Sequence, residues 1–495
     1  MNPLNMIDFY KADHRRQYPE GTEYVYSNFT PRSSRLFNPN TGQVFDDKVV
    51  FVGLQSYMKR VLIDRWRNEF FLRDKDEVVA EYKNRMDASL GVDAVPTDHI
   101  EALHNLGYLP IRIKALPEGS RVNIGVPMFT LVNTMPEFFW LTNYLETSIS
   151  AEVWKPCTTA TIAHEYKRLM NDYAEETGAS TDTIPIQCHD FSYRGMSGSE
   201  DAAQSGIGHL TSFIGTDSVV AIDHAEQYYG NNGELPTGVS VPATEHSVMC
   251  MGGKEDERET LRRLSVDIYP SGIFSVVADT WSFFDFITNH ASSLKDEILN
   301  RTPDENGMCK TVFRPDSGNP VDIICGDSSY PSDSPEGKGA MQCLWEVFGG
   351  TINEKGYKVL NEKVGLIYGD SITLERAEDI LVGLMNMGFA SSNIVFGVGS
   401  YTYQHITRDT FGFAMKATWG VVNGEPRAIF KDPVTDSGDK KSARGLLRVD
   451  KVYDDLQLVD DVSPEQEHRG ELKTVFLNGT LTSSTTLDEI RDRLS

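Results

Sequence analysis

The chain is poor in cysteine, and the few cysteines it has are scattered. The six stand at positions 157, 188, 250, 309, 325 and 343, and no two of them form a Cys-x-x-Cys pair. Zinc sites and disulfide frameworks both depend on closely and regularly spaced cysteines. The spacing gives no indication of either, and predicts six reduced thiols.

Long apolar runs and a surplus of positive charge are also missing. No apolar stretch approaches the roughly 20 residues that span a bilayer, and the N-terminus lacks the charged start and apolar core of a signal peptide. We therefore expect a cytoplasmic protein with no membrane association. The formal net charge of −25 argues against nucleic-acid binding, because phosphate backbones are held by clustered Lys and Arg. A phosphate-bearing ligand would need a local basic pocket inside an acidic shell.

The residues that are present are those of an ordinary folded protein. The 495 residues are 40% hydrophobic and 10% aromatic, which fits two or three average domains or one large α/β domain with an appended one. A period-two strand pattern at 24–29, helical periodicity over 50–107 and short strand patterns between 109 and 132 indicate a mixed α+β region. After residue 400 come further strand-like stretches and a polar loop at 436–444 that is rich in basic residues.

Between residues 150 and 400 the pattern alternates between strands and helices. Seven strand candidates are each followed by charged or glycine-rich residues, namely 184–189, 212–214, 238–241, 274–278, 311–313, 365–368 and 393–396. Parallel strands joined by right-handed crossovers place all their carboxyl ends on one face, where barrel and doubly wound enzymes build their sites. The pattern predicts an α/β barrel-like enzyme domain.

One stretch, Gly238 to Met249, places a histidine where phosphate chemistry would use one. Pro242 stops a buried strand, and Thr244 is predicted to cap a following short helix through its hydroxyl. His246 then lies in the first turn of that helix, where free backbone N–H groups and the helix dipole favour an anion. Glu245 is a candidate partner for the ring. The alternative for any single histidine is an ordinary surface or core residue.

Other polar residues follow the predicted strands. The Gly397-x-Gly399 turn is too short for a dinucleotide fingerprint, but its glycines would let backbone N–H groups approach a phosphate. Arginine side chains would bind phosphate, and the candidates are Arg194, Arg314 and Arg408. Aspartate side chains would bind hydrated Mg²⁺ or a ribose hydroxyl, and the candidates are Asp279, Asp316 and Asp370. Phosphates, a sugar and Mg²⁺ together indicate phosphoribosyl chemistry.

A set of motifs spread along the chain resembles the nicotinamide phosphoribosyltransferases. The matching pieces are Asp8-x-Tyr-Lys11, His189-Asp-Phe-Ser-Tyr-Arg-Gly195, Gly215-Thr-Asp217, Ser240-Val-Pro-Ala-Thr-Glu-His-Ser247, Arg314-Pro-Asp-Ser-Gly-Asn-Pro320, Lys355-Gly-Tyr-Lys358, Gly369-Asp370, Thr407-Arg-Asp409, Phe430-Lys-Asp-Pro433 and Asp488-Glu-Ile-Arg491. Two positions depart from the family pattern: Ser400 stands where the family has a glycine, and Ile406 where it has leucine.

The resemblance implies a fold and a reaction. The fold would be the barrel-like parallel α/β domain of type II phosphoribosyltransferases over 151–400, with a mixed α+β domain formed from 1–150 and 401–495. The reaction would join nicotinamide to 5-phosphoribosyl 1-diphosphate, giving nicotinamide mononucleotide and diphosphate in NAD salvage. ATP would serve as co-substrate by phosphorylating His246, and Mg²⁺ would be held by Asp279 and Asp316 through water.

The resemblance also implies roles for individual residues. Phe191 would stack on the pyridine ring, with Tyr10 of a second subunit on the other side, so that the site would need a homodimer. Asp217 and Arg314 would complete the nicotinamide site, and Glu245 and Asp279 would orient His246. The phosphoribose and diphosphate would be bound by Arg32, Arg194, His246, Arg314, Asp316, Gly369, Asp370, Gly399, Ser400, Arg408, Lys416 and Lys431.

Three alternatives stay open on the sequence alone. A nicotinate or quinolinate phosphoribosyltransferase would share the broad fold, and a binding or signalling protein could keep the fold without catalysis. Asp217 has its own alternative, because an aspartate before a predicted helix at 218–229 would ordinarily cap that helix.

Overall fold

The computed structural model describes residues 1–231, 233, 235–430 and 443–495. Its strands are β1 Thr22–Thr30, β2 Lys48–Val50, β3 Ile111–Ala115, β4 Arg121–Asn123, β5 Phe129–Asn133, β6 Cys188–Asp190, β7 Gly215–Thr216, β8 Gly272–Val277, β9 Cys309–Arg314, β10 Gly350–Ile352, β11 Lys358–Leu360, β12 Val364–Tyr368, β13 Ile394–Val398, β14 Ala414–Val422, β15 Glu425–Ala428, β16 Leu446–Val452, β17 Asp455–Val462, β18 Lys473–Leu477 and β19 Thr480–Leu481.

The α-helices cover both ends of the chain and the middle. They are α1 His14–Gln17, α2 Leu54–Tyr57, α3 Lys75–Leu90, α4 Asp98–Leu106, α5 Leu141–Tyr144, α6 Glu146–Thr177, α7 Ile184–Gln187, α8 Ser199–Leu210, α9 Val219–Tyr228, α10 His246–Gly252, α11 Glu257–Arg262, α12 Phe283–Asp285, α13 Lys295–Leu299, α14 Pro320–Cys325, α15 Pro335–Phe348, α16 Leu374–Asn386, α17 Ser400–Tyr403, α18 Pro464–Glu467 and α19 Leu487–Arg493.

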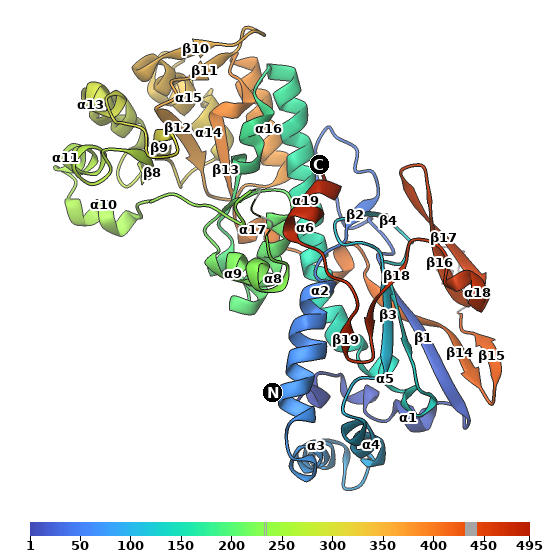
Figure 1. Ribbon diagram of the computed structural model, residues 1–495. Helices are drawn as coiled ribbons and strands as arrows, with labels where there is room; N and C mark the ends of the chain where they lie inside the picture. The colour runs from blue at the N-terminus through green and yellow to red at the C-terminus, as the bar shows by residue number, and fades with distance from the viewer. Residues whose placement is uncertain (232, 234, 431–442) are drawn as a thin grey trace.

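A seven-stranded antiparallel sheet combines strands from the two ends of the chain. Its order is β15-β14-β1-β5-β3-β18-β19, and β1 lies between β14 and β5. Figure 1 shows this sheet in blue, cyan, orange and dark red, with α3 and α4 beneath it. The 32-residue helix α6 leads from this part of the molecule into the next, and it begins at Glu146, just before the predicted boundary at 150/151. The boundaries themselves stay a prediction.

The second sheet is parallel and six-stranded. Its order is β7-β6-β13-β12-β9-β8, with parallel pairing throughout. The segment 239–243 links the two edge strands, because Val239 bridges Gly215 of β7 and Ala243 bridges Ser275 of β8. The sheet is therefore barrel-like, as predicted. The predicted strand at 212–214 was wrong, because the backbone turns there and strand β7 begins at Gly215.

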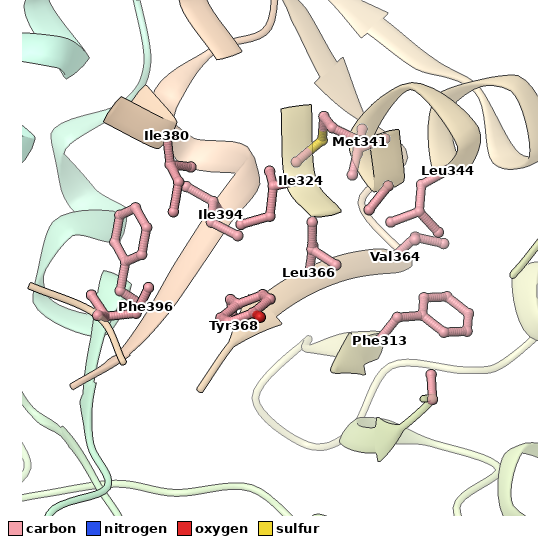
Figure 2. Packing of buried hydrophobic residues seen from close by; sticks show 14 of the residues in the cluster. Phe313, Ile324, Met341, Leu344, Val364, Leu366, Tyr368, Ile380, Ile394 and Phe396 are labelled. Atoms are coloured by element: carbon pink, nitrogen blue, oxygen red, sulfur yellow. The ribbon is translucent and has the colours of Figure 1, made fainter. Parts of the chain in front are cut away.

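Alternating residues of the parallel strands pack against the surrounding helices. Leu366 and Tyr368 of β12, together with Ile394 and Phe396 of β13, point toward α14, α15 and α16 (Figure 2). Every residue of β12 is buried, which is typical of parallel sheets covered on both faces. This packing fixes the strands, so the residues that follow their carboxyl ends are held on a rigid frame.

The C-terminal helix α19 packs onto the barrel rather than extending away from it. Leu487 and Ile490 share a buried cluster with Ile207 of α8. Arg491 donates to the carbonyls of Leu210, Pro236 and Thr237 at 2.9, 3.1 and 2.8 Å. Arg491, the last residue of the motif at 488–491, therefore fixes the backbone that leads into the segment 239–243.

Candidate functional site

The carboxyl ends of the parallel strands gather most of the predicted site residues at one edge of the sheet. Each of them lies at or just after the end of a parallel strand or of the segment 239–243, here called the bridging segment. They are Phe191, Asp217, Glu245 and His246, Asp279, Arg314 and Asp316, Gly369 and Asp370, and Gly399 and Ser400. Parallel pairing brings them together although they are spread over about 200 positions.

His246 is the first residue of α10 and is about half exposed. Its Nε2 atom lies 3.8 Å from Asp279 Oδ1 and 3.9 Å from Asp316 Oδ2. Its Nδ1 atom lies 3.3 Å from the hydroxyl of Thr280. The ring therefore stands between a hydroxyl on one side and two carboxylates on the other.

The predicted helix cap at Thr244 was wrong. Glu245 occupies the N-cap position of α10 without a side-chain hydrogen bond to the helix. The Thr244 hydroxyl instead accepts from the backbone N–H of Val277 at 2.9 Å, because the segment 239–243 runs beside β8. The Glu245 carboxylate accepts from Ser247, so its predicted role in orienting His246 stays a prediction.

Asp279 is the most buried carboxylate of this group, with its side chain 5% exposed. Its Oδ2 atom accepts from the Asp316 backbone N–H at 2.8 Å and from the Ser317 hydroxyl at 2.6 Å. Its Oδ1 atom is buried without a hydrogen-bond partner among the described residues. Burial, followed by the nearby carboxylates of Asp370, Asp279 and Asp316, raises the pKa of Tyr368. Three carboxylates thus lie near Tyr368, and Oδ1 of Asp279 is an acceptor atom without a hydrogen bond from the described residues.

These carboxylates fit Mg²⁺ only with help from a ligand. Within the described parts of the chain, no three His, Cys, Asp or Glu side chains form a group that would hold a metal ion. Mg²⁺ is commonly held by one or two carboxylates together with substrate phosphates and water. Asp279 and Asp316 supply the carboxylates, and Oδ1 of Asp279, which accepts no hydrogen bond from the described residues, fits such a site.

Phe191 lies against two glycines of neighbouring strands. A Cβ atom at Gly369 would lie 3.0 Å from Phe191 Cε2, and one at Gly397 would lie 2.5 Å from the same atom. The backbone N–H of Phe191 donates to Val398 at 2.9 Å. The missing side chains make room for the aromatic ring at the strand ends.

Asp217 does not cap the helix that follows it. The N-cap residue of α9 is Ser218, and the helix receives no side-chain cap hydrogen bond there. The Asp217 Oδ1 atom instead lies 3.0 Å from His189 Nε2 and accepts from the Ser240 hydroxyl at 2.6 Å. Burial would raise the pKa of Asp217, but the hydrogen bonds from His189 and Ser240 outweigh it and hold the pKa below its ordinary value.

The predicted phosphate-binding residues fall into two groups. Arg314 donates to the Thr244 carbonyl at 3.0 Å, and its Nε atom is buried without a partner among the described residues. Arg194 is exposed in the turn Tyr193–Gly195, and a Cβ atom at Gly195 would overlap the Ser400 hydroxyl. This first group lies at the edge of the barrel.

The second group lies where β1 and β14 meet. Arg32 Nε donates to the Gly412 carbonyl at 2.9 Å, which ties it to the turn that holds Arg408. Lys416 lies on β14 opposite Asn28. The exposed Tyr10 ring stands 5.1 Å from His14, and none of the described ring contacts joins it to Phe191. Lys431 and most of the loop 436–444 lie outside the described residues.

Several polar contacts at this edge were not predicted. Thr280 and Ser317 contact His246 and Asp279, and both follow predicted site residues in the sequence. Lys155 of α6 donates to both Asp201 oxygens at 2.7 and 2.8 Å and also contacts Gln404, although its position inside a helix gave no signal. Gln404, which follows α17, also donates to the Ser197 hydroxyl at 2.6 Å and so connects α17 to the loop after Arg194.

Comparison with known proteins decides the family. The model of the nicotinate phosphoribosyltransferase family matches residues 186–480, and that of the nicotinamide phosphoribosyltransferase N-terminal domain matches residues 2–113. The nicotinamide phosphoribosyltransferase of Acinetobacter baylyi is 65% identical over 100% of this chain and 97% of its own length. That of Xanthomonas campestris is 33% identical over 99% of this chain and 97% of its own.

The chain belongs to the nicotinamide phosphoribosyltransferase family.

The fold of this phosphoribosyltransferase is that of the type II class. A nicotinate-nucleotide pyrophosphorylase from Pyrococcus furiosus covers 100% of this chain and 94% of its own at a TM-score of 0.53 and 15% identity. Human nicotinic acid phosphoribosyltransferase covers 98% of this chain and 92% of its own at a TM-score of 0.52 and 14% identity. Membership of the family makes the chain an enzyme, a pentosyltransferase of NAD biosynthesis. None of the described helices is long and apolar enough to cross a membrane.

Proposed function

We propose that the chain transfers the phosphoribosyl group of 5-phosphoribosyl 1-diphosphate to nicotinamide, giving nicotinamide mononucleotide and diphosphate in the cytoplasm. The observation that carries this proposal is the 65% identity to a nicotinamide phosphoribosyltransferase over the full chain. The carboxylate of Asp217, held by His189 and Ser240 beside Phe191, adds a chemical reason for the amide as substrate. Phe191 stacks on the pyridine ring, and Asp217 accepts from its amide NH₂.

The phosphoribosyl group binds along the same edge. Gly369 and Asp370 hold ribose hydroxyls, while Gly399, Ser400 and the arginines bind phosphates. As diphosphate leaves, the ribose ring becomes cationic at C1, and the carboxylates of Asp316 and Asp279 favour that charge. A Mg²⁺ held by Asp279 and Asp316 would supply positive charge for the departing diphosphate.

ATP acts as a co-substrate through His246. The γ-phosphoryl group passes from ATP to a ring nitrogen of His246 and leaves ADP. Two observations support this role: the ring is accessible to ligands, and Thr280 and the two carboxylates hold it from opposite sides. Histidine side chains oriented by carboxylates are common in such nucleophilic steps.

Labelled ATP should mark His246. Incubation with γ-labelled ATP should leave acid-labile, base-stable label on the wild-type protein and none on His246→Ala, because the substitution removes the ring nitrogens that would accept the phosphoryl group. His468→Ala, which removes an exposed histidine at the end of α18, serves as the control and should label normally. Equal labelling of His246→Ala and wild type would show that the phosphoryl group goes elsewhere.

The active enzyme is a homodimer with shared sites, in which Tyr10 of one subunit faces Phe191 of the other. Tyr10 is 59% exposed in the single chain, so its ring is accessible to a second subunit. Mixing Tyr10→Ala subunits with Phe191→Ala subunits should restore part of the activity, since each mixed dimer has one intact site. Different tags on the two variants verify that mixed dimers have formed. If verified mixed dimers recover no activity, each chain builds its own site.

One assay tests the proposed function as a whole. Purified protein is incubated with 5-phosphoribosyl 1-diphosphate, Mg²⁺ and either nicotinamide, nicotinate or quinolinate, with and without ATP, and the mononucleotide formed is measured. Nicotinamide mononucleotide should be the main product, and ATP should increase its yield. Preferential use of nicotinate or quinolinate would assign a different pyridine, and no product from any of the three would point to a binding protein.

A further inference from the structure

His189 lies in β6, Asp217 directly follows the neighbouring strand β7, and the two side chains meet. His189 of β6 pairs with Gly215 of β7, which places Asp217 two residues beyond the pair. A Cβ atom at Gly215 would lie only 2.7 Å from His189 Nδ1, so the imidazole can lie over β7 because that residue is glycine. From this position Nε2 reaches Asp217 Oδ1 at 3.0 Å.

Both hydrogen-bond donors to Asp217 reach the same oxygen. The Ser240 hydroxyl donates to Oδ1 at 2.6 Å, as His189 does at 3.0 Å. Within the described residues, no hydrogen bond reaches Oδ2. A carboxylate with two donors on one oxygen is fixed in rotation and offers the lone pairs of the other oxygen to a ligand.

His189 also contacts the aromatic residue of the site. Its ring lies edge-to-face with Phe191, with centroids 5.1 Å apart and an interplanar angle of 62°. The His189 imidazole thus contacts both Phe191, the proposed stacking ring, and Asp217, the proposed partner of the pyridine substituent. It therefore determines how these two side chains lie relative to each other. A hydrogen bond to a carboxylate places the imidazole proton on Nε2, so the neutral ring is a sufficient donor.

We propose that His189 is a positioning residue for the choice of pyridine: its Nε2–H holds Asp217 by Oδ1 so that Oδ2 faces the ring substituent. This inference rests on the proposed function, because Asp217 must be the group that meets the substituent. His189 takes no part in the bond-making steps. Its effect is on the ratio of kcat/KM for nicotinamide to kcat/KM for nicotinate.

The charged and titratable groups around Asp217 determine how this ratio varies with pH. Asp217 faces His189 from β6, Ser240 from the bridging segment and Arg314 from β9. Burial opposes ionisation of Asp217, whereas these three neighbours favour it. Removing the His189 donor raises the pKa of Asp217, so protonation, and with it acceptance of nicotinate, should increase as the pH falls.

Two substitutions separate hydrogen bonding from packing. His189→Leu removes the donor, and His189→Gln keeps an amide N–H close to the position of Nε2. We expect His189→Leu to lower the nicotinamide-to-nicotinate ratio about 10-fold, mainly through KM for nicotinamide, because a hydrogen bond to a charged group is worth about that factor. His189→Gln should recover most of the ratio, and the loss in His189→Leu should deepen toward acidic pH.

A double-mutant cycle supplies the control. In an Asp217→Asn background, His189→Leu should leave the ratio unchanged, because the carboxylate that it positions is gone. Equal losses for both pyridines would reduce His189 to a packing residue, and a ratio that rises in His189→Leu would show that His189 acts as a cation; either result overturns the proposal. If wild type does not turn over nicotinamide, the proposed function fails instead. Calorimetric titration of nicotinamide into wild type and the Leu and Gln variants then tests His189 without turnover, and equal affinities overturn its role.

Discussion

Asp217→Asn or Asp217→Ser should reduce the preference for nicotinamide over nicotinate by roughly 100-fold. Under the proposed function, the Asp217 carboxylate accepts from the nicotinamide NH₂, whereas it would meet the nicotinate carboxylate with like charge. Sites built on such pairing discriminate by about 10⁴-fold, because the wrong partner leaves buried polar groups unpaired. A neutral side chain removes the repulsion, so nicotinate use should rise while nicotinamide use falls. Steady-state kcat/KM for both pyridines measures the change.

The control is Asp223→Asn, which alters an exposed carboxylate on α9 and should leave the ratio unchanged. Hydrogen bonds from His189 and Ser240 hold the pKa of Asp217 below its ordinary value. The carboxylate therefore stays ionised throughout the neutral range, and wild-type discrimination should be flat there. A wild type that uses nicotinate as well as nicotinamide, or variants that keep the wild-type ratio, would remove Asp217 from substrate selection.

The sequence predicted that the site residues gather at one edge of the sheet, because parallel strands share one direction. Asp279, Asp316 and Gly369 are far apart along the chain, yet each follows a strand of the same sheet. Once the alternation of strands and helices was recognised, their meeting at the carboxyl ends followed from the handedness of the crossovers. The sequence shows that glycines follow these strands, but it does not show that two of them, Gly369 and Gly397, contact the Phe191 ring.

Hydrogen-bond partners across strands were beyond sequence reasoning. Ser240 lies 23 positions from Asp217, and His189 lies 28, so only the strand order and register bring the three side chains together. The cap predicted at Thr244 was wrong for a related reason: the Thr244 hydroxyl accepts from the backbone N–H of Val277 in β8, a residue distant in sequence. Local patterns predict local caps, and tertiary contacts then replace them.

A different limit applies to residues whose roles need a second molecule. Arg32, Arg408 and Lys416 gather near the junction of β1 and β14, and Tyr10 stands exposed near the N-terminus. The predicted partners of these residues are ligand phosphates and, for Tyr10, a second subunit. Their roles stay predictions that subunit mixing and kinetics test.

Gly397→Ala should lower kcat/KM for nicotinamide on the order of 100-fold. The added Cβ would lie 2.5 Å from Phe191 Cε2 and 2.7 Å from the Cα atom of Gly369. Since real Cβ contacts are not that short, either the aromatic ring or strand β12 must move. Overpacking of this kind costs about 1–3 kcal/mol, and a ring displaced from the pyridine site loses its stacking contact as well. The loss should appear mainly in KM for nicotinamide.

Two further variants separate loss of stacking from loss of folding. Gly365→Ala adds a methyl group to β12, where the nearest atom is the flexible Lys310 Cδ at 2.9 Å, and should retain most activity. Adding Phe191→Ala to Gly397→Ala removes the clash with the ring but leaves the contact with the Gly369 Cα atom at 2.7 Å, so part of the lost melting temperature should return while KM for nicotinamide stays high. If the melting temperature and KM for nicotinamide both recover, Phe191 only fills space at the strand ends. A Gly397→Ala enzyme with wild-type KM would show that the pyridine binds away from this ring.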